Sequence, residues 1–71
     1  MSSISAAETL LAKARSRQPA TVTFRNPGHG QKTVTAQVID VSIAVDRKLS
    51  FLLATRGGHL AVHEDYLITA L

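Results

Sequence analysis

The chain has 71 residues, of which 45% are hydrophobic and 18% charged, and it contains no cysteine. This length excludes a two-domain enzyme and predicts a single small domain over residues 1–71. The apolar content is typical of a folded chain and not of a disordered tail. Without cysteine there is neither a disulfide framework nor a thiolate metal site, so a hydrophobic core, extended by any oligomer contacts, must stabilise the domain.

Positive charge is concentrated in the first part of the chain. Residues 1–32 carry five basic side chains against one acidic, whereas residues 33–71 carry three basic against four acidic, which gives the net charge of +3. Such a balance makes a polyanion or an acidic protein surface the first partner to consider, although a modest charge also serves solubility. No apolar run approaches the ~20 residues of a membrane span, and the N-terminus lacks signal-peptide features. We therefore expect a cytoplasmic protein that does not enter a membrane.

The first segment is predicted to form an amphipathic helix over about residues 5–17. Ser5 and Glu8 have the spacing of a capping box, and Pro19 disfavours helical geometry at the residue before it. Basic residues near the end of the segment suit the negative end of a helix dipole. The apolar side chains recur at three- and four-residue spacing, which places them on one stripe, namely Ile4, Ala7, Leu10, Leu11 and Ala14.

From residue 20 onward the sequence predicts about five short strands. Residues 20–25 alternate in polarity, and the turn formers at 26–30 predict a hairpin. In the next segment the apolar residues lie at even positions to Val38 and then at odd positions from Val41 to Val45, which indicates a bulge near Asp40. Residues 49–55, residues 60–62 and residues 66–71 are the remaining strand candidates, with Gly57 and Gly58 as a tight turn.

This order predicts a mainly β fold with one N-terminal helix and a small five-stranded antiparallel barrel over about residues 20–71. No helix separates the strands, so a parallel sheet is excluded. The order of these features resembles the Sm-like barrel, which is also SH3-like in pattern. The features are the helix with a basic end, Pro19, the strand with Val22 and Phe24, the glycine turn, the bent strand and the last strand at 67–71.

Two bacterial branches of that family are similar to parts of this sequence. The stretch from Val38 to Asp65, with Ile68, resembles the Rho-binding antiterminator (Rof-like) family, in which an aspartate precedes a longer basic loop and an apolar strand. Residues 11–24 are similar in pattern to the RNA chaperone Hfq, and His63 stands near the position of its lysine and histidine motif, with no lysine beside it.

The resemblance implies a non-enzymatic protein that modulates Rho-dependent termination by binding a protein partner. Within that interpretation the expected partner-binding residues are Arg47, Lys48 and Arg56. The alternative is a ring-forming homo-oligomer that binds RNA through a basic surface made of Lys13, Arg15, Arg17, Arg25, Lys32 and His63. A third alternative is an SH3-like phage or host-protein-binding accessory module, which the same fold pattern would serve.

Other chemistry has little support in the sequence. There is neither a nucleophile elbow nor a phosphate loop, so no catalytic residue is expected. Phe24 and Phe51 lie in apolar patterns and are predicted core residues, whereas Tyr66 is freer to stack on a base, with packing as the favoured role. Asp40 is interpreted as a bulge residue bonded to the backbone.

The three histidines raise the question of a metal site. They lie at positions 29, 59 and 63. His59 and His63 share a face of a regular strand, but four residues of strand span about 13 Å, too far to hold one ion together. We therefore expect no metal and no other cofactor.

Overall fold

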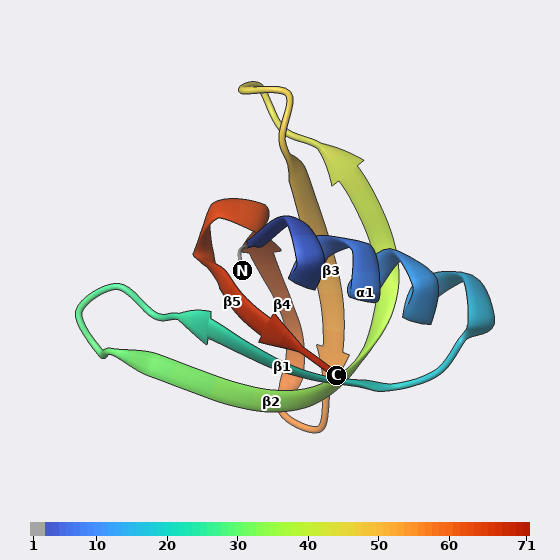
Figure 1. Ribbon diagram of the computed structural model, residues 1–71. Helices are drawn as coiled ribbons and strands as arrows, with labels where there is room; N and C mark the ends of the chain where they lie inside the picture. Colours follow the sequence, from blue (N-terminus) through green and yellow to red (C-terminus); the bar gives the residue numbers. More distant parts are fainter. Residues whose placement is uncertain (1–2) are drawn as a thin grey trace.

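The computed structural model describes residues 3–71, with side chains from Ala6 onward. Helix α1 (Ser3–Ser16) is followed by strands β1 (Ala20–Arg25), β2 (Gln31–Ile43), β3 (Leu49–Thr55) and β4 (Gly58–His63). The 3₁₀ helix η1 (Glu64–Tyr66) and strand β5 (Leu67–Ala70) complete the chain (Figure 1). Neither helix of this described part has the length and apolar character that a membrane crossing requires.

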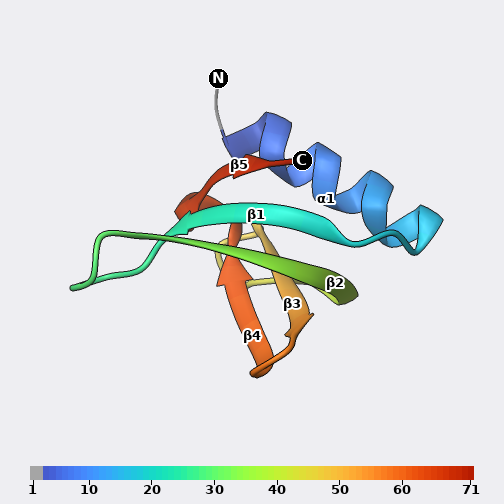
Figure 2. The same ribbon diagram turned by 90° about the horizontal axis from the view of Figure 1, so that it is seen from below.

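The five strands form one antiparallel sheet in the order β4-β3-β2-β1-β5. This confirms the predicted fold class, a mainly β domain with one N-terminal helix and five antiparallel strands. The sheet curves like a barrel but is not closed, because β4 and β5 remain its two edges. Figure 2 shows α1 lying over β1 and β5 on one side of the curved sheet.

The bend in β2 lets this single strand pair with both halves of the sheet. Its first part pairs with β1 and its second part with β3, and the register shifts between Val38 and Asp40. This is the bulge that the change of apolar phase predicts. The Asp40 carboxylate accepts a hydrogen bond from the Val41 N–H at 2.9 Å, and Asp40 is exposed, as expected for a bulge residue bonded to the backbone.

Helix α1 ends in a hydrogen-bonded motif that usually contains glycine. The Gln18 N–H donates to the Lys13 carbonyl at 3.0 Å and the Arg17 N–H to the Ala14 carbonyl at 3.3 Å, which is the Schellman pattern. Arg17 has the left-handed φ of 56° that this pattern requires. At the other end the described helix extends to Ser3, so Ser5 lies inside the helix and not at its cap. The Ser5 side chain lies outside the described residues.

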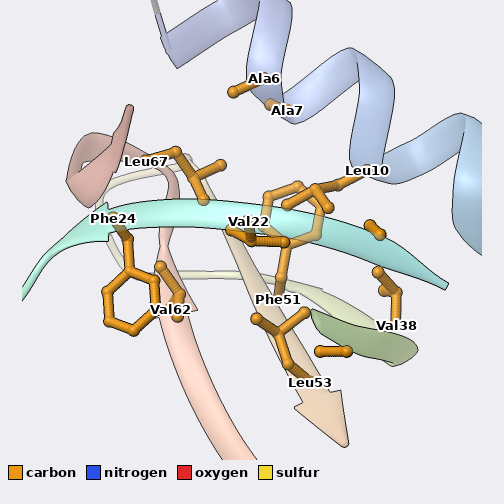
Figure 3. Close-up of a cluster of buried hydrophobic side chains, with 12 residues drawn as sticks. Ala6, Ala7, Leu10, Val22, Phe24, Val38, Phe51, Leu53, Val62 and Leu67 are labelled. Carbon is orange, nitrogen blue, oxygen red and sulfur yellow. The ribbon is translucent and has the colours of Figure 1, made fainter. Parts of the chain in front are cut away.

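The core lies between α1 and the concave side of the sheet. Leu10, Val22, Phe51 and Leu53 are the largest fully buried side chains, and Figure 3 shows Leu10 descending from the helix toward the strand residues. Phe24 is also buried, so the predicted core role of both phenylalanines is confirmed. The helix therefore covers one side of a core that the open sheet leaves uncovered.

Two expectations about the strands are wrong. Strand β2 ends at Ile43, and Val45 lies in a turn closed by hydrogen bonds from Ala44 N–H to the Lys48 carbonyl and from Arg47 N–H to the Ala44 carbonyl. Turn geometry directs the side chain of Val45 outward, so this residue does not continue the apolar row. Tyr66 belongs to η1 and not to the last strand.

Candidate binding site around the 3₁₀ helix

The structure distributes the predicted nucleic-acid-binding residues over separate parts of the molecule. Lys13, Arg15 and Arg17 lie at the end of α1, whereas Arg25 and Lys32 lie at the hairpin end of β1 and β2. Figure 1 shows these two places at opposite ends of β1, and six residues of strand span about 17–20 Å. These cations do not form one basic surface.

The predicted partner-binding residues are divided in the same way. Arg47 and Lys48 precede β3, and Arg56 follows it in the turn to β4. The seven residues of β3 separate the two ends by about 20 Å. Only Arg47 and Lys48 therefore belong to one surface, and Arg56 lies on the far end of the strand.

The ends of several elements meet around η1 because the strand registers bring them together. Strands β3 and β4 pair Ser50 with His63, and continuing this register by two places sets Lys48 opposite Asp65. Strands β1 and β5 pair Phe24 with Leu67, so the next residues, Arg25 and Tyr66, are neighbours. We call the resulting group the η1 cluster, defined as Arg25, Asp46, Lys48, His63, Asp65 and Tyr66.

His63 connects this 3₁₀ helix to the β2–β3 turn. Its Nδ1 atom accepts a hydrogen bond from the Asp65 N–H at 3.0 Å, which caps η1, and its Nε2 atom lies 2.8 Å from Asp46 Oδ2. Since Nδ1 is an acceptor, the neutral ring is assigned the tautomer with its proton on Nε2, which donates to the Asp46 carboxylate.

Two further contacts hold the same turn. The Lys48 ammonium donates to both Asp65 carboxylate oxygens, at 2.8 and 3.1 Å, and the Leu49 N–H donates to Glu64 Oε1 at 2.7 Å. The β2–β3 turn therefore contacts β4 through Asp46 and contacts η1 through Lys48 and Leu49. This arrangement has no signal in the sequence, because the partners are 15 and 17 residues apart and no local pattern links them.

The carboxylates of the cluster stabilise charges that lie within it. The Lys48 N–H donates to Asp46 Oδ1 at 3.1 Å, and this bond, followed by the hydrogen bond and charge of His63, lowers the pKa of Asp46. The hydrogen bond to Asp65 raises the pKa of Lys48. Lys48 and His63 are thus engaged by aspartates, an arrangement that does not favour phosphate binding at these two residues.

Three side chains of this cluster have the composition of a metal site. Ligand atoms of Asp46, His63 and Asp65 lie within 4.8 Å of one another. However, a metal on His63 Nε2 would require the neutral ring to carry its proton on Nδ1, where it would face the Asp65 N–H. Lys48 also occupies the Asp65 carboxylate. The hydrogen bonds therefore do not fit a metal ion bound by these three residues. His59 lies near the opposite end of β4, away from His63.

Tyr66 separates two hollows on the surface. One, of about 400 Å³, is lined by Arg25, Gln31, Tyr66 and four residues of the β1–β2 turn. The other, of about 350 Å³, is lined by Asp46, His63, Asp65 and Tyr66. The Arg25 guanidinium lies 5.5 Å from the centre of the Tyr66 ring, and Tyr66 is 40% exposed. Packing, the expected role of Tyr66, therefore accounts for only part of its side chain, and the rest is exposed to solvent.

The tip of the β2–β3 turn projects away from this cluster. We define the turn tip as Ile43, Val45 and Arg47. Ile43 is 73% exposed and Val45 is as exposed as in an extended chain, at 105%. Arg47 has a left-handed φ of 67°, and its guanidinium forms no hydrogen bond or ion pair with any described residue. In Figure 1 this turn extends beyond the rest of the sheet.

Comparisons of the chain with protein-family models, with curated proteins and with solved structures find no match.

Proposed function

We propose that this protein is a non-enzymatic binding module that modulates transcription termination by docking its β2–β3 turn on a protein partner. The Rof-like resemblance of the sequence names the termination factor Rho as the first partner to test. The observation that carries the proposal is the turn tip. Two exposed apolar side chains and a guanidinium with no hydrogen bond or ion pair to a described residue lie there, on a turn that Asp46 and Lys48 hold against His63 and Asp65.

The composition of the turn tip suits a protein surface. Contiguous exposed apolar side chains are typical of interaction sites, and arginine is enriched at protein interfaces. Val45 and Ile43 would supply the buried apolar contact, and Arg47 would pair with an acidic group of the partner.

The contacts beneath the tip support the same proposal. A loop that is already ordered loses less conformational entropy on binding than a mobile one. Lys48 and Asp46 turn back toward Asp65 and His63, so they act as positioning residues and the tip residues make the contact. The proposal thus gives Arg47 and Lys48 different roles, although the two are adjacent in sequence.

Direct RNA binding is a weaker interpretation of this geometry. Lys48 and His63 are held by aspartates, and the remaining predicted RNA-binding cations lie at distant ends of the fold. A phosphate backbone attracts cations that are close together and free of carboxylates.

The proposal is tested by measuring binding to purified Rho with immobilised protein. Val45→Asp and Arg47→Glu should each weaken binding at least about tenfold, since each removes a contact from the centre of the interface. Arg56→Glu makes the same charge change at the other end of β3 and should leave affinity within about twofold. Lys48→Met should weaken binding by an intermediate factor, because it keeps the tip residues and releases the turn.

Three results would contradict the proposal. The first is unchanged Rho binding by both tip variants, and the second is an equal loss in Arg56→Glu. The third is an absence of Rho binding together with a ring-sized particle that binds a labelled RNA in a strongly salt-dependent way, which would favour the RNA-binding alternative.

A further inference from the structure

The hollow beside the β1–β2 turn contains an arginine with unused hydrogen-bonding capacity. Arg25 is held in place on two sides, by the Tyr66 ring at 5.5 Å and by one long hydrogen bond from its Nη2 to the Asp65 carbonyl at 3.4 Å. A guanidinium has five N–H donors. Most of the Arg25 donors therefore have no acceptor among the described residues.

The other residues of the hollow make an anion its natural occupant. Its lining contains no acidic side chain, so Arg25 is the single formal charge there. The volume of about 400 Å³ lies in the lower part of the range of small-molecule sites, roughly 300–1,000 Å³. An oxyanion on Arg25 would be bound by parallel charge-assisted hydrogen bonds, which planar guanidinium groups favour.

The side chains next to Arg25 add a planar surface to this charge. Arg25 pairs with Gln31 across β1 and β2, and Tyr66, the last residue of η1, lies beside Arg25 with its ring centre 5.5 Å from the guanidinium. Tyr66 is 40% exposed, and the part of its ring that the Arg25 guanidinium does not cover, like the guanidinium plane itself, is a surface on which a nucleobase stacks. The side-chain amides of Gln31 and Asn26 form no hydrogen bond within the described residues and can pair with the polar edge of a base.

The turn itself leaves room for a ligand close to the backbone. Gly28 and Gly30 have φ of 81° and 75°, and a Cβ added to either would meet no atom within 4 Å. Open space at both positions means that a bound molecule can lie directly against this turn.

From these observations we infer that the hollow binds a mononucleotide, with the phosphate on Arg25 and the base against Tyr66. This inference does not rest on the proposed function, because the β2–β3 turn lines neither wall of this hollow. A second source of the same chemistry is a nucleotide within a single-stranded RNA, and the experiment separates the two.

The test is an NMR titration of the ¹⁵N-labelled protein with AMP, GMP, CMP and UMP in separate series. We expect saturable shifts of the backbone amides of residues 25–26, 28–31 and 65–67 with at least one mononucleotide. Inorganic phosphate or the matching nucleoside alone should bind at least about tenfold more weakly, since each offers half of the contacts.

Variants assign the binding to the two proposed groups. Arg25→Lys keeps the charge but loses the planar fork, and Tyr66→Leu keeps apolar bulk but loses the ring. Each variant should weaken mononucleotide binding about tenfold or more, because Arg25→Lys removes a charge-assisted contact and Tyr66→Leu removes the stacked base. Arg56→Gln and Val45→Asp should leave the titration unchanged, and the dispersed spectrum of each variant reports that it is folded.

The inference is overturned by an absence of saturable shifts at millimolar mononucleotide. It is also overturned if inorganic phosphate binds as tightly as every mononucleotide, which would identify an anion site without base recognition. Binding of a short single-stranded RNA with no binding of the mononucleotides would assign the hollow to RNA and would equally reject the free ligand. Because Val45→Asp affects only the β2–β3 turn, failure of this inference and failure of Rho binding are separate results.

Discussion

Leu10 offers the sharpest test of how the helix stabilises this fold. Its side chain is 0% exposed and enters the core from α1 against strand residues such as Val22 and Phe51. Leu10→Ala removes the buried branched end of this side chain and leaves a cavity, which costs about 2–5 kcal/mol in comparable cores. A 71-residue domain has a free energy of unfolding of about 4–11 kcal/mol, so this single change removes a large part of it.

The measurement is urea denaturation followed by circular dichroism. With an m-value of about 1 kcal/mol/M for so small a domain, the midpoint should fall by roughly 2 M or more. The matched control is Leu71→Ala, because Leu71 is 76% exposed and the same change should cost less than about 0.5 kcal/mol. A loss below about 1 kcal/mol for Leu10→Ala would refute the conclusion that α1 closes the core.

Three further predictions concern backbone geometry and pH. Arg17→Gly should raise the free energy of unfolding by about 0.5–1 kcal/mol in the same assay, because Arg17 has a left-handed φ of 56° that glycine adopts at no steric cost. A decrease in the free energy of unfolding would contradict the Schellman motif at the end of α1. Gly58→Ala should lower it by about 1 kcal/mol or more, since Gly58 has φ 130°, whereas Gly57→Ala should have little effect; equal effects would argue against that conformation. The lowered pKa of Asp46 contributes stability that is present above its unfolded pKa and is lost as the pH falls through the folded pKa. The raised pKa of Lys48 contributes stability that is present below its unfolded pKa of about 10.5 and is lost as the pH rises through the folded pKa. Asp46→Asn should therefore flatten the acid limb of a stability–pH profile and Lys48→Met the alkaline limb, and unchanged limbs would show that these contacts do not persist in solution.

The secondary structure of this protein could be predicted from its sequence with few errors. Residues 20–25 and 49–55 form the predicted strands, and the change of apolar phase near Asp40 located the bulge in β2. These features are local, because the repeat of apolar residues reports which side of one element faces the core. The errors fell where the pattern continued past the end of an element, as at Val45, which extends an apolar row into a turn.

The candidate sites could be predicted only in part. The sequence singled out Arg25, Arg47, Lys48 and His63, but it grouped residues by charge and by neighbourhood in the chain. In the structure Arg25 lies beside Tyr66, Lys48 is paired with Asp65, and the Arg47 side chain has no partner among the residues that the structure describes. Asp46 and Asp65 were not candidates, because each pairs with a residue 17 positions away in the chain and no local sequence pattern indicates that partner.

The sequence by itself determined the helix, the strands and the bend, since hydrophobic periodicity and turn residues act within a few positions of one another. The tertiary structure decided which charges meet, because that depends on the registers of β3 with β4 and of β1 with β5. Those registers are fixed by the burial of Phe51, Val62 and Leu67 in a shared core, and a shift of one residue would turn each of these side chains to solvent. The ion pairs around η1 and the hollow beside Arg25 are consequences of that packing.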